Sequence, residues 1–153
     1  MATNRYWLNP VVPPEDCGIM YLRRTITFDL PYADAPGVAA TNGVPIGALE
    51  AGAIPLGCDV TIETAFNAGT TNTLDIGVAG TPAGLAATAA VLPAATGFKQ
   101  NLTGTLTGIP LAANTIVYAK YAQTGTAATT GKAHVVLKFA LKQEGEGIPF
   151  PAN

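Results

Sequence analysis

The amino-acid sequence predicts an all-β chain that folds as a single β-sandwich of jelly-roll type, with an extended N-terminal arm and a short C-terminal tail. Two observations predict this fold class. Apolar and polar residues alternate with a period of two in several short segments, which is typical of strands with one buried face. The chain is also interrupted by 17 glycines and 12 prolines in 153 residues, and such breaks separate many short strands. The length suits one domain with its own core.

We divide the chain into three parts: an arm over residues 1–18, a sandwich over residues 19–143 and a tail over residues 144–153. Three prolines within five positions of the arm forbid a helix and favour an extended course. The tail is rich in glycine and proline. No repeat of solenoid period is present, so a single sandwich is the predicted body of the molecule.

Alternation predicts the strands of the sandwich in order along the chain. The first covers residues 20–30, with Arg24 interrupting its apolar face. Two further strands cover residues 115–123 and 133–141. Each has apolar side chains in one phase and polar side chains in the other, so each has one face toward the core.

Other segments predict shorter or irregular structure. Residues 31–43 read as a loop, and the prolines and glycines of residues 44–56 allow only short strands. Residues 76–98 carry no charge, and we expect a strand, a long loop and one short helical turn near residues 85–91. The threonine-rich segment within residues 100–111 predicts another short strand.

The strongest local pattern runs from residue 59 to residue 80, DVTIETAFNAGTTNTLDIGVAG. Val60 and Ile62 alternate with polar residues before the break, and Leu74 and Ile76 do so after it. The segment 67–72 between them consists of residues that suit turns. We therefore expect a β-hairpin here.

Composition and charge narrow the classes of partner. Charged residues make up 12% of the chain and the net charge is −2, against about 25% charged residues in ordinary soluble domains. A surface so poor in charge favours a subunit held in an assembly. Arg23 and Arg24 are the only basic pair and would point to opposite faces of a strand, so we expect no nucleic-acid partner. The many prolines and glycines of residues 76–98 argue against a membrane span.

The sequence offers no set of residues for catalysis or metal binding, and we expect neither enzymatic activity nor a cofactor. It contains no serine, which closes the serine hydrolase mechanisms. His134 is its one histidine and falls on the polar phase of the last strand, where it is expected to face solvent. Asp59, Glu63 and Asp75 fall on the polar face of the expected hairpin and would be close enough to approach one another, but no aromatic platform for a sugar accompanies them.

The two cysteines indicate the compartment. Cys17 and Cys58 lie far apart, outside any metal-ligand spacing, and Cys58 falls on the apolar phase of its strand. We expect Cys58 to be a buried free thiol. The N-terminus shows no apolar secretory core, so synthesis in a reducing cytoplasm is expected.

The termini are predicted to carry the partner contacts, because tryptophan and tyrosine are enriched where proteins meet. The arm could equally pack along its own sandwich. Arg23 is included because its side chain could pair with carboxylates of a partner. The residues that we expect at a partner interface are Tyr6, Trp7, Pro10, Val11, Val12, Arg23 and Phe150.

Two longer segments carry a resemblance to a known family. They are TAFNAGTTNTLDIGVAGTPAGLA, residues 64–86, and IVYAKYAQTGTAATTGKAHVVLKFAL, residues 116–141. The order and composition of these segments resemble the small capsid decoration, or cement, proteins of tailed bacteriophages. The proline-rich arm is not part of that pattern, and related strings also occur in other phage virion proteins.

The resemblance implies a structural virion protein that binds the outside of a phage capsid and stabilises the lattice of the major capsid protein. Its implied partners are that capsid protein and neighbouring copies of itself, as a dimer or a trimer. It would be made in the host cytoplasm and end on the capsid exterior. The alternative is a β-sandwich module of a tail or fibre that binds a receptor or carbohydrate.

Overall fold

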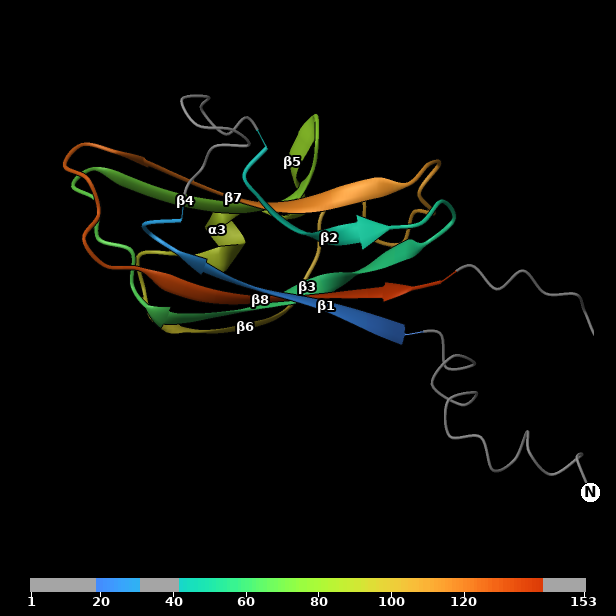
Figure 1. Ribbon diagram of the computed structural model, residues 1–153. Coiled ribbons are helices and arrows are strands. Elements are labelled where there is room, and N and C mark those ends of the chain that lie inside the picture. Colours follow the sequence, from blue (N-terminus) through green and yellow to red (C-terminus); the bar gives the residue numbers. More distant parts are fainter. Residues whose placement is uncertain (1–18, 31–41, 142–153) are drawn as a thin grey trace, which may run out of the picture.

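The computed structural model describes residues 19–30 and 42–141. Within them lie eight strands and one short helix: β1 (Ile19–Thr27), β2 (Val44–Leu49), β3 (Ile54–Thr64), β4 (Thr71–Val78), β5 (Thr81–Ala86), α3 (Thr88–Val91), β6 (Gly97–Leu102), β7 (Thr115–Thr124) and β8 (Lys132–Ala140). They form two four-stranded sheets, which lie face to face as two layers (Figure 1). The predicted arm and tail, residues 1–18 and 144–153, lie outside the described residues.

The strand order confirms a β-sandwich of jelly-roll type. One sheet has the order β1-β8-β3-β6 and the other β2-β7-β4-β5. Four antiparallel pairs, β1/β8, β2/β7, β3/β6 and β4/β5, describe one long hairpin folded about its middle. The pairs β3/β8 and β4/β7 then join its parts side by side, and this rolled hairpin is the jelly roll.

The predicted hairpin over residues 59–80 is wrong. β3 and β4 belong to different sheets, and the chain between them crosses from one layer to the other. The crossing is bonded to the equivalent crossing between β7 and β8: the N–H of Gly69 donates to the carbonyl of Thr126 at 2.8 Å, and that of Thr70 to the carbonyl of Thr124 at 3.0 Å. The turn-forming residues therefore make an interlayer corner, not a hairpin loop.

Two further differences concern residues 76–111. β5 was not expected as a strand of its own, although α3 confirms the short helical turn. The threonine-rich strand is only partly confirmed, because β6 ends at Leu102. Beyond it the N–H of Gly104 bonds to Thr107 Oγ1 at 2.9 Å, and that of Leu106 bonds to the carbonyl of Gly84 at 2.9 Å. These residues therefore turn back onto β5 instead of extending the sheet.

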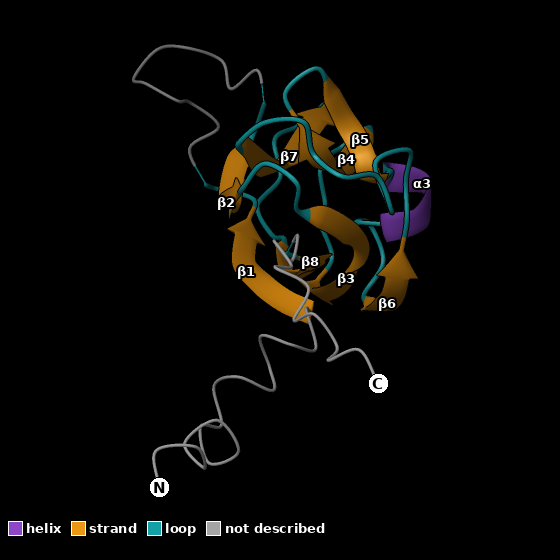
Figure 2. Ribbon diagram, turned by 90° about the vertical axis from the view of Figure 1, so that its right-hand side faces the viewer, coloured by secondary structure: helices purple, strands orange, loops and turns teal. Residues whose placement is uncertain are grey.

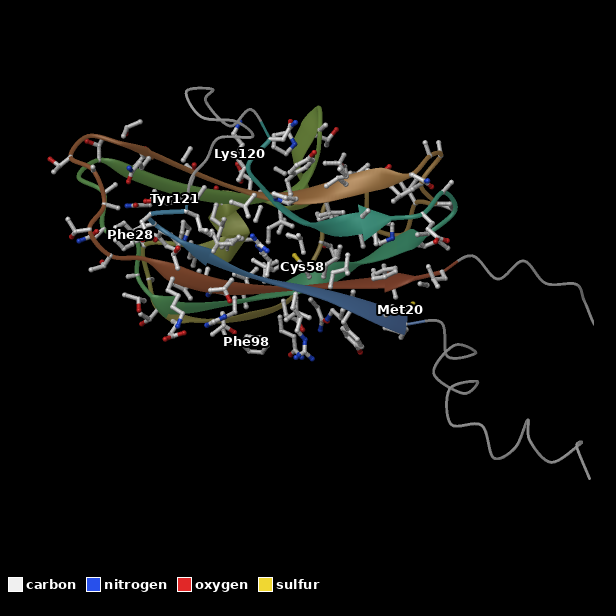
Figure 3. The ribbon with its side chains drawn as sticks, in the orientation of Figure 1. Met20, Phe28, Cys58, Phe98, Lys120 and Tyr121 are labelled. Carbon is white, nitrogen blue, oxygen red and sulfur yellow. The ribbon has the colours of Figure 1, made fainter. Side chains whose placement is uncertain are left out.

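The core follows the alternation that the sequence shows. In β8, Val135 and Leu137 face inward with no exposed area, and Phe139 is 6% exposed. Cys58 of β3 lies between the two sheets (Figure 3), which confirms the predicted buried thiol. Within the described part of the chain, no helix is long and apolar enough to cross a membrane.

The two open sides of the sandwich differ. Figure 2 shows α3 on one side, next to β6 and below β5, with β1 and β2 together on the other. Val91 of α3 is fully buried, so the helix fills its side. On the opposite side a Cβ at Gly47 would lie 2.7 Å from Cδ1 of Leu22. The glycine therefore lets the edge strands β1 and β2 approach each other.

Candidate interaction surface

Of the predicted interface residues, the structure describes only Arg23. It lies at the middle of β1, opposite Val136 of β8, and its side chain is exposed on the outer face of its sheet. The other residues lie outside the described part of the chain: Tyr6, Trp7, Pro10, Val11, Val12 and Phe150. The interface assignment of all seven stays a prediction.

Exposed apolar side chains gather at the end of the sandwich where β1 begins and β8 ends. Ile19 is 47% exposed, Met20 43% and Tyr21 56%, and the same end carries exposed Leu56 and Leu141. Figure 3 shows Met20 at this end of β1. Ile109 also lies near this end, because the N–H of its neighbour Gly108 donates to the carbonyl of Pro55, next to Leu56, at 2.7 Å. We call these six side chains the end patch: Ile19, Met20, Tyr21, Leu56, Ile109 and Leu141.

The sequence pattern does not predict the end patch, because the alternation of residues 20–30 puts Met20 on the apolar face of its strand. A signal was present, since Ile19, Met20 and Tyr21 are consecutive and put apolar side chains on both faces. A strand that packs on the core with one face needs apolar side chains on that face alone, so apolar side chains on both faces indicate a second contact. Because larger exposed apolar patches mark interaction surfaces, this end of the sandwich is a candidate contact surface.

Both terminal segments join the sandwich at this same end. Ile19 and Ala140 are directly paired across β1 and β8. Eighteen residues precede Ile19 in the sequence, and thirteen follow Ala140. The segments that contain Trp7 and Phe150 therefore attach to neighbouring strands, beside the end patch.

The outer face of this sheet carries a polar network around Asp59. Its Oδ1 accepts hydrogen bonds from the Lys138 ammonium at 2.9 Å and from the backbone N–H of Asn101 at 2.7 Å. Both charged side chains are less than one-fifth exposed. Partial burial raises the pKa of the Asp59 carboxyl, but the Asn101 N–H and the Lys138 ammonium outweigh it and hold the pKa below its ordinary value of 3.8.

A second network surrounds Glu63 on the same face. Its carboxylate contacts His134 Nε2 at 2.6 Å and the Lys132 ammonium at 2.9 Å, and the other ring nitrogen of His134 contacts Thr25 Oγ1 at 3.1 Å. The hydrogen bonds from His134 and Lys132 lower the Glu63 pKa. His134 therefore faces outward as predicted, but its two nitrogens link β1, β8 and β3.

The three carboxylates singled out in the sequence are not brought together. Asp59 and Glu63 lie on β3, whereas Asp75 lies on β4 in the other sheet. Asp75 Oδ1 accepts from both the N–H and the hydroxyl of Thr88 at 2.7 Å, so it fixes the start of α3. The expected approach of Asp75 to Asp59 and Glu63 is wrong, because β3 and β4 do not pair.

The buried thiol of Cys58 is a poor nucleophile. Burial raises the Cys58 pKa to about 12, with a smaller contribution from the charge of Asp59. The thiolate is the nucleophilic form of cysteine, and it is scarce at neutral pH when the pKa is this high. Cys58 therefore acts as a small apolar residue of the core.

The Asp59 network leads to a prediction about stability. We expect Asp59→Asn to lower the free energy of unfolding at pH 7 by about 1–2 kcal/mol, because Lys138 keeps its charge but loses its ionised partner in a partly buried site. Since the folded-state pKa is lowered, this stabilisation is present above the ordinary pKa of 3.8 and is lost as the pH falls through the folded value. Urea unfolding at several pH values measures both effects.

Glu63→Gln is the matched control for this prediction, since Glu63 has a similar set of partners but its side chain is 49% exposed. We expect a smaller loss from it, because exposed ion pairs are screened by water. Equal losses from the two variants at pH 7 would contradict the importance of the Asp59 network.

Comparison with known proteins finds a similar fold but no matching family. No family model matches the chain, and the search of curated proteins finds no similar one. Among solved structures, a chain from the "Cyanophage Pam1 capsid asymmetric unit" superposes with a TM-score of 0.58 at 20% sequence identity. The superposition covers 81% of this chain and 85% of that chain. This chain therefore shares its overall fold with a component of a cyanophage capsid.

Proposed function

We propose that this chain is a non-enzymatic structural protein of a phage virion, which binds the outside of the capsid and stabilises the lattice of the major capsid protein. The observation that carries the proposal is the jelly-roll fold that it shares with a chain of a cyanophage capsid, over most of the length of both chains. The resemblance of residues 64–86 and 116–141 to capsid decoration proteins supports the same function.

Physical properties of the chain support attachment to a shell. Its low charge suits a protein that is held among neighbours. The end patch and the two terminal segments that attach beside it would supply several contacts at one end of the sandwich. Once one contact forms, each further contact becomes intramolecular, so weak contacts add up to firm retention. Contacts between copies, as dimers or trimers, would follow the local symmetry of the lattice.

Particle composition and shell binding test the proposal. Mass spectrometry of purified particles is expected to find this protein, and the purified protein is expected to co-sediment with expanded capsids that lack it. Binding to host glycans in place of capsids would contradict the proposal and favour a tail or fibre module.

The predicted arm gives a more specific test. Deletion of residues 1–14 is expected to weaken shell binding, because the arm holds the aromatic and apolar residues assigned to the interface. The melting temperature should stay unchanged, since the described sandwich begins at Ile19. Unchanged retention on capsids would remove the arm from the interface.

A single substitution examines the arm more gently. Trp7→Ala is expected to cost about 2 kcal/mol of binding, or roughly thirtyfold in affinity, if Trp7 anchors the interface. Quantitative co-sedimentation at several protein concentrations measures the change. An affinity within a factor of two of the unmodified protein would exclude Trp7 as an anchor.

A further inference from the structure

We propose that the free edge of β1 is a docking site for an extended strand of another protein, and that this strand places a carboxylate against Arg23 on the outer face of the sheet. The proposal deepens the proposed function and rests on it, because on a virion the strand would belong to the shell. Three features of the molecule carry it: the edge strands of the two sheets, the charges on β1 and the shape of the surface beside it.

β1 differs from the other edge strands of the described sandwich. It has nine residues, and each one from Ile19 to Thr27 pairs with β8 without a shift of register. The edges β2, β5 and β6 have six residues each, and each has a register shift in its pairing. Pro45 and Pro82 further interrupt two of them. Short length, prolines and bulges protect a sheet edge from pairing with another strand, and β1 has none of these three features. Its arginines are charged residues that disfavour pairing with an uncharged or basic strand but not with an acidic one.

β1 is also accessible. All of its residues from Ile19 to Thr25 are exposed except Leu22, which is half-buried. A depression of about 350 Å³ lies at the middle of the strand, lined by Arg23, Arg24 and Thr25 of β1 and by the paired residues 134–136 of β8. An added strand would gain main-chain hydrogen bonds along the edge and a place for one side chain beside it.

The charges indicate the chemistry of the added strand. Neither Arg23 nor Arg24 forms an ion pair with any described residue. The nearby acids have other partners, since Asp59 is bonded to Lys138 and Glu63 to Lys132 and His134. The guanidinium group of Arg23, on the outer face of β1, is therefore open to a carboxylate from outside this set, and opposite charges on neighbouring strands attract. The side chain of Arg24 lies on the opposite face of the strand.

Two other occupants of the edge are disfavoured. Arg23 is the midpoint of β1, so a symmetric antiparallel pair of β1 strands from two copies would place like charges directly opposite each other. The chain's own residues 1–18 include Pro10, Pro13 and Pro14, which have no N–H to donate to an edge. A strand from a different protein, with an acidic residue at its centre, fits the edge best.

A designed peptide tests the edge without relying on the capsid. The probe is a capped eight-residue peptide of alternating threonine and valine with one central glutamate, and its control carries lysine instead. The glutamate peptide is expected to shift the amide NMR signals of residues 19–27 of the full chain, whereas the lysine peptide should leave them in place. Shifts centred on β2, β5 or β6, or no shifts at millimolar peptide, would overturn the proposal.

A pair of charge-matched variants extends the test to the shell. Arg23→Gln with Arg24→Gln removes two positive charges from β1, and Lys99→Gln with Lys120→Gln removes two from other strands. The arginine variant is expected to bind the glutamate peptide and expanded capsids about tenfold more weakly, and the lysine variant is expected to bind both unchanged. Unaltered melting temperatures confirm that both fold.

The outcomes separate the two proposals. Wild-type binding to capsids with an equal affinity for the arginine variant would overturn the β1 assignment and leave the proposed function standing. Peptide binding at β1 without capsid binding would do the reverse. If deletion of residues 1–18 removes protection of β1 amides from hydrogen exchange in the free protein, the chain's own arm covers the edge and the proposal is wrong.

Discussion

Replacement of Phe66 by alanine is expected to lower the free energy of unfolding by about 3–5 kcal/mol. Phe66 is 1% exposed, and its ring lies 4.4 Å from that of Tyr121, centroid to centroid. Its N–H donates to the carbonyl of Pro93 at 3.0 Å, and its ring occupies the space that a side chain at Gly131 would need. Alanine would leave a cavity among the three segments that meet at this ring.

Phe98→Ala is the matched control, because Phe98 is 57% exposed on the outer face of its sheet (Figure 3). Its replacement is expected to change the free energy of unfolding by less than about 0.5 kcal/mol. Chemical denaturation followed by circular dichroism measures both variants. A loss below about 1 kcal/mol for Phe66→Ala would contradict the role of this corner in closing the sandwich.

Gly77→Ala is expected to be nearly as damaging, with a loss of about 3 kcal/mol of unfolding free energy. A Cβ at this position would lie 2.2 Å from the carbonyl oxygen of Thr81 and 2.6 Å from that of Pro82. These atoms belong to the backbone of β5, so a side-chain rotation cannot relieve the overlap. β5 would have to move away from β4, and its pairing would weaken.

Gly80→Ala separates the overlap from backbone strain. Gly80 has a φ of 80°, but a Cβ added there would have no atom within 4 Å, so its replacement costs only the left-handed conformation, about 1–2 kcal/mol. Thermal unfolding of the two variants gives the comparison. A larger loss at Gly80 than at Gly77 would contradict the close contact between β4 and β5.

The sequence predicts the faces of the strands far better than their neighbours. In β3 and β4 the apolar phase is right, since Val60, Ile62, Leu74 and Ile76 are all buried. Alternation indicates which face of a strand is buried, but it does not indicate which other strand pairs with it. In a jelly roll many paired strands are distant in sequence. The Gly/Thr/Asn segment after β3 is therefore compatible both with a hairpin loop and with a corner between the layers.

The polar networks could not be predicted for the same reason. Glu63 and His134 are 71 residues apart, and Asp59 and Lys138 are 79 apart. They meet only because β3 and β8 pair as antiparallel strands, with Thr61 opposite His134 and Asp59 opposite Val136. β5 escaped prediction because Pro82 and Gly84 argue against a strand, although an edge strand tolerates both.

The predicted interface is the part of the sequence prediction that the structure tests least. The sequence favours residues of the two terminal segments, and the structure describes only Arg23 among the predicted residues. What the structure adds is the place where those segments attach: two paired strand ends beside six exposed apolar side chains. This convergence is a property of the β1/β8 pairing, which no local pattern indicates.

The most direct test of the central claim is a cryo-electron microscopy reconstruction of the virion that carries this protein. The proposed function predicts density for the jelly roll on the outer surface of the capsid, with the end patch directed toward the major capsid protein. Density for this fold only in the tail or fibres, or none on the shell of particles that contain the protein, would contradict it.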